Sequence, residues 1–295
     1  MRVPPQPSTF DCSSLPTGPP GRTSPLPLGC ILDPGCRQTV VVSHRGAGVD
    51  SVELLPRLHL PLGRFAPENS LAALRWAILV GADAVEIDLQ TSRDGHLVLI
   101  HDEDVSRTTN GTGRVDRLTL RSLQQLRLAT AQFRDDFRCE QIPTLEQALE
   151  LARGRINIVV DLKWADARKV ARLVRRAGMA RQVLLMPPSA DMARLTRLVP
   201  DMPLVARPGR SAQRLEQMLQ DHAPAVVQIP QACVTPGVIA TVHAAGAKVA
   251  VNGFENDISG YLTESPAAYA TLLARHADII NVDRADLLLR LMGRR

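Results

Sequence analysis

Acidic residues and histidines recur in this sequence at spacings that could support chemistry. Glu86-Ile87-Asp88 places two acids two residues apart, and in a strand such residues share one face. Two carboxylates that converge away from water repel each other. A hard divalent cation relieves that repulsion, and oxygen ligands suit Mg²⁺, Ca²⁺ or Mn²⁺. On spacing alone, solvated acids on an exposed edge strand are the more common alternative.

A second group of residues, His44-Arg45-Gly46, combines a proton carrier with an anion binder. Histidine exchanges protons near neutral pH, and arginine can hold a phosphate oxygen in bidentate fashion. Glycine allows the backbone to turn sharply. By itself the tripeptide is weak evidence, because a lone histidine is more often structural.

Two further pairs have the same dual character. His101-Asp102 joins a histidine to an acid that could orient its ring or cap a turn. Asp161 and Lys163 would share one face of a strand. A simple ion pair explains the second pair as well as a functional role does.

The elements that would position these residues alternate along the chain. Short apolar runs predict strands at 39–43, 84–89, 97–100, 156–161, 183–186, 204–206, 225–229, 248–251 and 278–282. Helical spacing predicts helices at 69–80, 118–128, 144–152, 166–177, 190–198, 212–221, 235–245, 266–275 and 284–291.

Repeated strand–helix units of this kind imply an α/β fold with a parallel sheet. Eight of them, with 97–100 as an extra strand, favour a closed (β/α)₈ TIM barrel. The open doubly wound alternative would require a Gly-rich phosphate loop after the first strand, and none is present.

In such a barrel, catalytic residues gather at the carboxyl ends of the strands. The ionisable and polar residues that end or follow a predicted strand are His44, Arg45, Glu86, Asp88, His101, Asp102, Asp161, Lys163 and Asn252. We therefore expect these scattered motifs to form one site.

Composition limits the other classes of function. Apolar residues make up 45% of the 295 residues, which is enough for a sizeable core, and the net charge of +5 is spread along the chain. The sequence contains no basic run with interleaved aromatic residues, so it does not predict nucleic-acid binding. No apolar run approaches the roughly 20 residues of a transmembrane segment. The odd number of widely spaced cysteines, five, argues against a zinc site or a disulfide framework and favours a reducing cytoplasm.

The first 38 residues differ from the rest of the chain. Pro, Gly, Ser and Thr dominate residues 1–38, without a sustained period of 2 or 3.6. Such a composition predicts a disordered or loosely draped N-terminal arm. The predicted barrel domain is 39–295, and the long connection 47–67 is an insertion after its first strand.

Taken in order, the motifs resemble the glycerophosphodiester phosphodiesterase family, TIM-barrel enzymes related to phosphatidylinositol-specific phospholipase C. The matching segments are His44–Gly46, Pro67–Ser70, Glu86–Gly95, Leu97–Asp102, Arg107–Gly113 and Ile142–Leu145. No single segment is specific, but the ordered combination is, and it is densest between residues 40 and 163.

The resemblance implies metal-dependent hydrolysis of glycerophosphodiesters to sn-glycerol 3-phosphate and an alcohol. Under this interpretation His44 and His101 form the acid–base pair. The implied ligands of a divalent cation, Mg²⁺, Ca²⁺ or Mn²⁺, are Glu86, Asp88 and Asp161. The implied substrate contacts are Arg45, Lys163, Glu68 and Asn252.

The chain departs from the family pattern in ways that leave alternatives open. Asp161 stands where the family usually has glutamate, and Ala250 where it often has tryptophan. These changes would suit a non-catalytic barrel that binds glycerophosphodiesters. The loop expected at Gly253–Tyr261 is longer than usual, and the insertion at 47–67 is rich in leucine. An apolar wall there would suit a lysophospholipid substrate, as in a lysophospholipase D-like enzyme. The oligomeric state cannot be read from the sequence.

Overall fold

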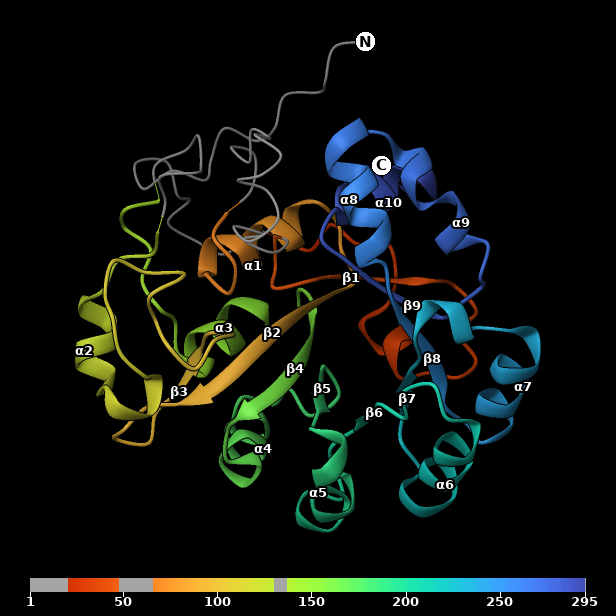
Figure 1. The fold of residues 1–295 in the computed structure, drawn as a ribbon, viewed down its shortest axis with the longest axis horizontal. Coiled ribbons are helices and arrows are strands. Elements are labelled where there is room, and N and C mark those ends of the chain that lie inside the picture. Colours follow the sequence, from red (N-terminus) through yellow and green to blue (C-terminus); the bar gives the residue numbers. More distant parts are fainter. Residues whose placement is uncertain (1–20, 48–65, 130–136, 295) are drawn as a thin grey trace.

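The structure, a computed structural model, describes residues 21–47, 66–129 and 137–294. The insertion predicted at 47–67 lies largely outside the described residues, as do the first twenty residues of the predicted arm. Figure 1 shows the remainder as a ring of helices around the strands.

Eight parallel strands form a nearly closed barrel. They follow the order β5-β4-β2-β1-β9-β8-β7-β6, and a parallel bridge between Leu185 and Leu204 links the two ends of this path. A short antiparallel strand, β3 (Leu97–Leu99), pairs with β2 outside the path. The barrel strands are β1 (Val40–Ser43), β2 (Ala84–Thr91), β4 (Asn157–Trp164), β5 (Val183–Met186), β6 (Val205–Ala206), β7 (Val226–Gln228), β8 (Lys248–Asn252) and β9 (Ile279–Val282). The predicted TIM barrel and its extra strand are confirmed.

Alternation along the strands produces two apolar layers. Inside the barrel, Val42, Val159 and Ile279 belong to one buried cluster. Between the strands and the helices, Val41 and Val160 belong to another. Because inward positions near the carboxyl ends are polar, the inner layer stops below the mouth of the barrel.

The helices cover the outside of the barrel (Figure 1). Side chains of Ser70, Thr144 and Asp166 cap the helices that follow them, by accepting hydrogen bonds from backbone N–H groups of the first turn. The helices are α1 (Leu71–Leu79), α2 (Leu120–Gln125), α3 (Leu145–Ala152), α4 (Ala167–Arg176), α5 (Met192–Leu198), α6 (Ala212–His222), α7 (Pro236–Ala244), α8 (Phe254–Thr263), α9 (Ala270–Leu273) and α10 (Ala285–Leu291). None of the helices in the described part of the chain is both long and apolar enough to cross a membrane.

One predicted loop is a helix. The segment Gly253–Tyr261, expected to be a long loop, lies mostly within α8. Gly260 sits inside this helix and allows it to pack closely, since a Cβ there would lie 2.8 Å from the Tyr269 hydroxyl. Gly260 therefore serves helix packing.

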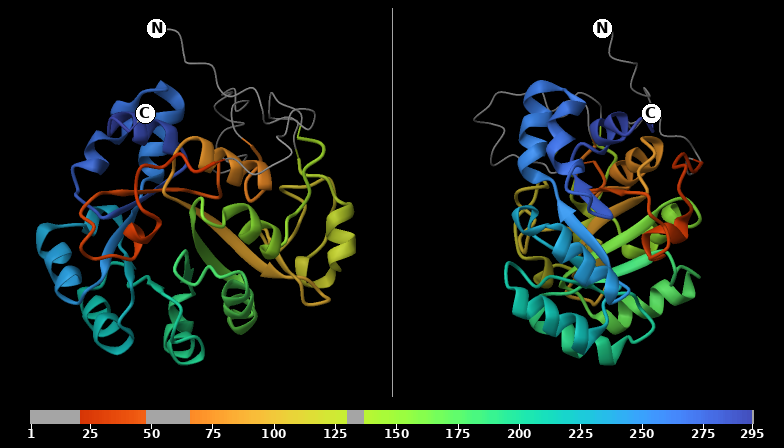
Figure 2. Two further views of the ribbon diagram at one scale, coloured as in Figure 1. Left: turned by 180° about the vertical axis from the view of Figure 1, so that it is seen from behind. Right: turned by 90° about the vertical axis from the view of Figure 1, so that its right-hand side faces the viewer.

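Residues 21–38, which the sequence analysis placed in the arm, are packed against the barrel. A short 3₁₀ helix, η1 (Leu28–Ile31), lies among them. Leu26, Cys30 and Ile31 are buried in the same cluster as the inward residues of the strands. Seen from behind in Figure 2, this segment crosses the end of the barrel. It closes the end opposite the carboxyl ends of the strands.

The cysteine count and spacing argued against a disulfide framework, but the structure contains disulfides. Cys30 and Cys36 form a disulfide with their Cα atoms 5.3 Å apart, and Cys139 is also disulfide-bonded. The turn after η1 brings the first two cysteines together, which cysteine spacing alone does not reveal. The sequence predicted a reducing cytoplasm because it indicated no disulfide framework. Disulfides persist mainly in oxidising compartments, so the cysteines no longer support that prediction.

The closed end also carries a buried charge. Lys248 is 2% exposed, and its ammonium donates hydrogen bonds to the carbonyls of Cys30 at 2.7 Å and Cys36 at 3.0 Å. Burial lowers the pKa of Lys248, and the charge of Asp278 partly offsets that effect. The disulfide-bonded loop thus supplies the oxygen acceptors that a buried ammonium needs.

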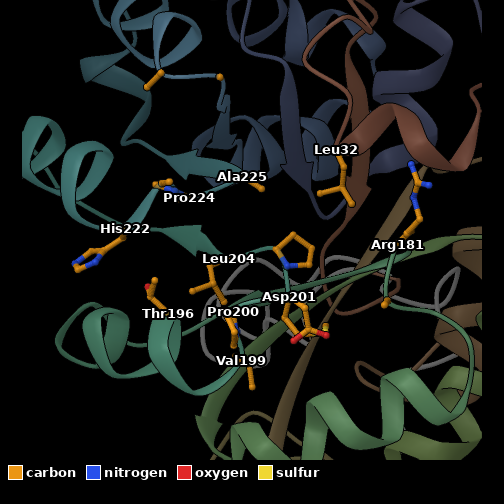
Figure 3. A pocket seen from close by; sticks show the side chains of 16 residues that line it. Leu32, Arg181, Thr196, Val199, Pro200, Asp201, Leu204, His222, Pro224 and Ala225 are labelled. Carbon is orange, nitrogen blue, oxygen red and sulfur yellow. The ribbon is translucent and has the colours of Figure 1, made fainter.

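A pocket of about 600 Å³ opens near this closed end, between the segments that lead into β6, β7 and β8. Figure 3 shows His222 and Arg181 on opposite sides of it, with Pro200, Leu204 and Ala225 between them. Since active sites of TIM barrels lie at the carboxyl ends of the strands, this pocket is not the candidate active site.

Candidate active site

The turn after β1 brings two candidate residues into the mouth of the barrel. Arg45 has φ +49° and Gly46 has φ +89°. A Cβ at Gly46 would lie 2.8 Å from backbone and side-chain carbons of Ala73, so only glycine fits there. The backbone N–H of Arg45 donates to Glu86, at 3.2 Å. This tight turn fixes His44 and Arg45 beside the acids of β2.

Three buried carboxylates converge in the mouth. One oxygen each from Glu86, Asp88 and Asp161 lies within 4.8 Å of the others. Register explains the convergence, since Asp88 is paired directly with Asp161 across β2 and β4. Burial, followed by repulsion from Asp88, raises the pKa of Glu86 to about 8. The three predicted metal ligands are therefore brought together at an electrostatic cost.

The donor set fits a hard divalent cation. Three carboxylates in a buried site supply the oxygen ligands that Mg²⁺, Ca²⁺ and Mn²⁺ prefer. Burial first, and the charge of Asp88 second, raise the pKa of Glu86, and a bound cation would offset both effects. Asp161, although one methylene shorter than glutamate, reaches the cluster.

Two basic residues share the acids of the cluster. Lys163 Nζ lies 2.7 Å from Asp161 Oδ2 and 3.3 Å from Asp88 Oδ1. Arg45 Nε lies 3.1 Å from Asp88 Oδ2. Burial opposes the ionisation of Asp88, but the charges of Arg45, His101 and Lys163 outweigh it and lower its pKa. The predicted phosphate contacts thus adjoin the predicted metal ligands.

Each of the two histidines lies beside its own carboxylate. His44 is buried, with Nδ1 2.8 Å from Asp283 and Nε2 3.8 Å from Glu86. Burial alone would lower its pKa, but the hydrogen bond to Asp283 and the nearby acids raise it. His101 is more exposed, and its Nδ1 lies 2.6 Å from Asp102. Both rings are therefore oriented by an acid.

A chain of charged hydrogen bonds connects His101 to Arg45. Arg107 donates to Asp102 at 2.5 Å and to both oxygens of Glu68 at 2.8 and 2.9 Å. Glu68 in turn accepts from Arg45 at 2.8 Å. Glu68, a predicted substrate contact, therefore acts in this structure as a buried support for two arginines.

Asn252 lies elsewhere in the mouth, at the end of β8. Its side-chain oxygen accepts hydrogen bonds from the amides of Gln228 and Asn281. Arg207, which follows β6, lines the same pocket as Gln228 and Asn252. We call Arg207, Gln228, Gln231, Asn252 and Asn281 the amide half of the mouth. The catalytic half comprises the residues around the three acids: His44, Arg45, Glu68, Glu86, Asp88, His101, Asp161 and Lys163.

Sequence analysis missed several residues of this mouth. Asp283 directly follows predicted strand 278–282, and Arg207 directly follows predicted strand 204–206. Both obey the strand-end rule that found the other residues, so the rule could have found them. Asn69 was noted only as part of a motif, yet its side chain donates to Asp88 at 2.9 Å and accepts from the Asp88 backbone at 3.0 Å.

The family model for the glycerophosphoryl diester phosphodiesterase family matches residues 44–287. The chain belongs to this family. The match includes both histidines of the catalytic half and the cluster of Glu86, Asp88 and Asp161. The family resemblance seen in the sequence motifs is therefore confirmed.

Curated relatives agree with this membership. A glycerophosphodiester phosphodiesterase of Caldanaerobacter subterraneus is 43% identical over 114 residues, 39% of this chain and 40% of its own length. A probable glycerophosphodiester phosphodiesterase 2 of Mycobacterium tuberculosis is 30% identical over 242 residues, covering 75% of this chain and 84% of its own. The first of these matches spans less than half of the relative's length.

Solved structures show the same fold. A glycerophosphodiester phosphodiesterase from Agrobacterium tumefaciens has a TM-score of 0.71 and 32% identity, and the match covers 86% of this chain and all of that one. An Oleispira antarctica phosphodiesterase, solved in complex with the product sn-glycerol-3-phosphate, has a TM-score of 0.68 and 22% identity, covering 88% and 99% of the two chains. The second likeness bears on the fold alone.

Proposed function

We propose that this protein hydrolyses glycerophosphodiesters to sn-glycerol 3-phosphate and an alcohol, with a divalent cation bound by Glu86, Asp88 and Asp161. One observation carries the proposal: three buried carboxylates converge in a mouth that also contains two histidines, each oriented by its own acid. Membership of the family supports the same activity.

The chemistry follows from the groups in the mouth. When water attacks, a P–O bond forms from water and the P–O bond to the alcohol breaks. When the glycerol hydroxyl next to the ester attacks, the alcohol leaves from a cyclic phosphodiester, and water then opens that ring to give sn-glycerol 3-phosphate. One histidine accepts the proton of the attacking hydroxyl, and the other supplies a proton to the departing oxygen. Asp283 and Asp102 keep the His44 and His101 rings oriented for these transfers.

Charge stabilisation falls to the residues around the acids. A bound divalent cation would offset negative charge that develops on the phosphate oxygens. Arg45 and Lys163 border the cluster and can bind the same oxygens. Glu68 holds the Arg45 guanidinium in place.

The direct test is release of sn-glycerol 3-phosphate from glycerophosphocholine and glycerophosphoglycerol. The purified protein is assayed with Mg²⁺, Ca²⁺ or Mn²⁺, and again after chelation. We expect release only with a cation. Binding of these diesters without turnover under every cation would instead support a non-catalytic barrel.

A lysophospholipid substrate is the second candidate, because an apolar stripe begins beside a candidate catalytic histidine. Phe254 packs on the His44 ring with centroids 4.5 Å apart. Phe254, Ile258 and Leu262, spaced four residues apart on α8, are 39%, 45% and 53% exposed. A higher kcat/KM for lysophosphatidylcholine than for glycerophosphocholine, lowered selectively by Ile258→Ser, would favour this candidate.

A further inference from the structure

The support behind His44 continues beyond Asp283 to a second buried acid, Asp257. This acid is 2% exposed and lies on α8, one turn after Phe254. A buried carboxylate is costly to hold, and burial, followed by the charge of Asp283, raises the pKa of Asp257 to about 8. The partners of Asp257 therefore indicate what the fold gains from it.

Asp257 binds the turn that carries Asp283. One of its carboxylate oxygens accepts a hydrogen bond from the backbone N–H of Asp283 at 3.0 Å, and the other accepts from the backbone N–H of Arg284 at 3.2 Å. These partners lie 26 and 27 residues away in the sequence, so the carboxylate does not serve its own helix. Two adjacent peptide N–H groups bound to one carboxylate fix the backbone from which the Asp283 side chain reaches His44.

A tyrosine holds Asp257 in turn. Tyr269, buried in the 3₁₀ helix η5 (Pro266–Tyr269), donates its hydroxyl hydrogen to the oxygen of Asp257 that also accepts from Arg284. Helices α8 and α10 both pack on η5 near the end of β9 (Figure 1). Because three donors engage the two oxygens, the carboxylate is held in one orientation.

Helix α8 reaches His44 by two routes. Phe254, in its first turn, packs on the His44 ring with centroids 4.5 Å apart. Asp257 reaches the same ring through the backbone and then the carboxylate of Asp283, which lies 2.8 Å from His44 Nδ1. The helix thus contacts the ring directly and also fixes the acid that orients it.

We propose that Asp257 is a positioning residue for hydrolysis, which holds Asp283 in the place where its carboxylate orients the His44 ring. The inference rests on the proposed function, in which His44 transfers a proton. Displacement of a catalytic group by about 1 Å can lower a rate about 10²-fold, so a fixed Asp283 backbone matters to the rate. A purely structural Asp257, which only joins α8 to α10, is the alternative that the experiment must separate.

Kinetics of a graded series of variants tests the inference. Asp257→Leu keeps the branched shape of the side chain and removes both acceptors, Asp257→Asn keeps one acceptor, and Tyr269→Phe keeps both backbone contacts. We expect kcat to fall about tenfold or more in Asp257→Leu, less in Asp257→Asn and least in Tyr269→Phe, with KM changed by no more than about twofold. Asp286→Asn is the matched control, because this acid bonds to the side chain of Arg284, at 2.9 Å, where Asp257 bonds to its backbone.

A double-mutant cycle separates positioning from general support of the fold. Asp283→Ala removes the carboxylate through which Asp257 acts, so adding Asp257→Asn should lower kcat by less than about twofold more. Losses that multiply would show that Asp257 acts independently of Asp283 and would overturn the inference. Thermal unfolding confirms that each variant is folded. If Asp257→Leu does not fold, Asp257→Asn and Tyr269→Phe carry the comparison.

NMR spectroscopy of the cation-free protein gives a readout that needs no turnover. The Nδ1 proton of His44, identified by its loss in His44→Gln, should exchange with water faster in Asp257→Asn than in the wild type or in Asp286→Asn. Unchanged exchange or an unchanged kcat in the Asp257 variants would overturn the inference. An inactive wild type whose His44 proton responds to Asp257→Asn contradicts the proposed function alone, whereas an active protein whose proton does not respond contradicts this inference alone.

Discussion

Both halves of the barrel mouth are built from residues at the carboxyl ends of the strands, and they differ in whether charged or uncharged groups hold their side chains in place. In the catalytic half, the basic groups Arg45 and Lys163 both contact acids, so charge holds the side chains in place. In the amide half, the uncharged side chains of Gln228, Asn252 and Asn281 bond to one another, and the side-chain oxygens of Gln231 and Asn281 accept no hydrogen bond from the described residues. We infer that chemistry needs the fixed half, whereas recognition can use the half with spare hydrogen-bonding capacity.

The strongest way to break this comparison is to remove a histidine from the catalytic half. His101→Ala should lower kcat by about 10²–10⁴-fold, the usual contribution of general acid–base catalysis. The fold should persist, because His101 is partly exposed and its main partner is the adjacent Asp102. Steady-state kinetics and thermal unfolding check both points. His96→Ala, an exposed histidine near β3, is the control, and a full-rate His101→Ala enzyme would refute the proposed role.

The next largest effect is expected at Asp161, which stands where the family usually has glutamate. Asp161→Asn should raise the cation concentration needed for half-maximal activity by about tenfold or more, since it removes one charged ligand. Direct cation binding by calorimetry provides a readout independent of turnover. Asp221→Asn on α6 serves as control, because this exposed acid lies outside the site. Unchanged cation affinity in Asp161→Asn would remove Asp161 from the ligand set.

The pH dependence of cation binding sharpens the comparison. Burial and Asp88 raise the pKa of Glu86 to about 8, so below that pH a cation must displace a proton. Apparent cation affinity should therefore rise with pH up to about 8 and then level off. Calorimetry in buffers of different ionisation enthalpy would measure the released proton. Affinity that is flat between pH 6 and pH 8 would contradict the protonated state of Glu86.

The smallest effect is expected in the amide half. Asn252→Ala should lower kcat/KM for glycerophosphodiesters by about two- to tenfold, the range for a neutral hydrogen bond. Cation affinity should stay unchanged, because Asn252 bonds to Gln228 and Asn281 and not to the acids. Paired kinetic and cation-binding measurements test this separation. A large shift in cation affinity would show that the two halves are coupled.

Much of the fold and of the catalytic half could be predicted because both depend on short periods in sequence. Successive side chains of a strand point to opposite faces, so Glu86 and Asp88 share a face of β2 whatever the position of β2 in the sheet. The parallel register then brings Asp161 level with Asp88. These contacts follow from the rules of a parallel barrel and need no knowledge of side-chain packing.

The remainder depended on contacts between distant residues. The interaction of His44 with Asp283 joins β1 to the end of β9, and only barrel closure brings the two together. Helix α8 forms because Gly260 lets it pack closely on Tyr269, a contact that local composition does not report. The disulfide between Cys30 and Cys36 requires the turn after η1.

The loop at the closed end of the barrel also bears on where the folding unit begins. Composition would suggest trimming the chain to start at residue 39. Such a chain would lose the carbonyls of Cys30 and Cys36 that solvate the Lys248 ammonium, and it would uncover apolar side chains inside the barrel. The first residue that a recombinant form must keep is therefore set by the hydrogen-bond acceptors that the buried Lys248 needs, and that residue lies upstream of the first strand.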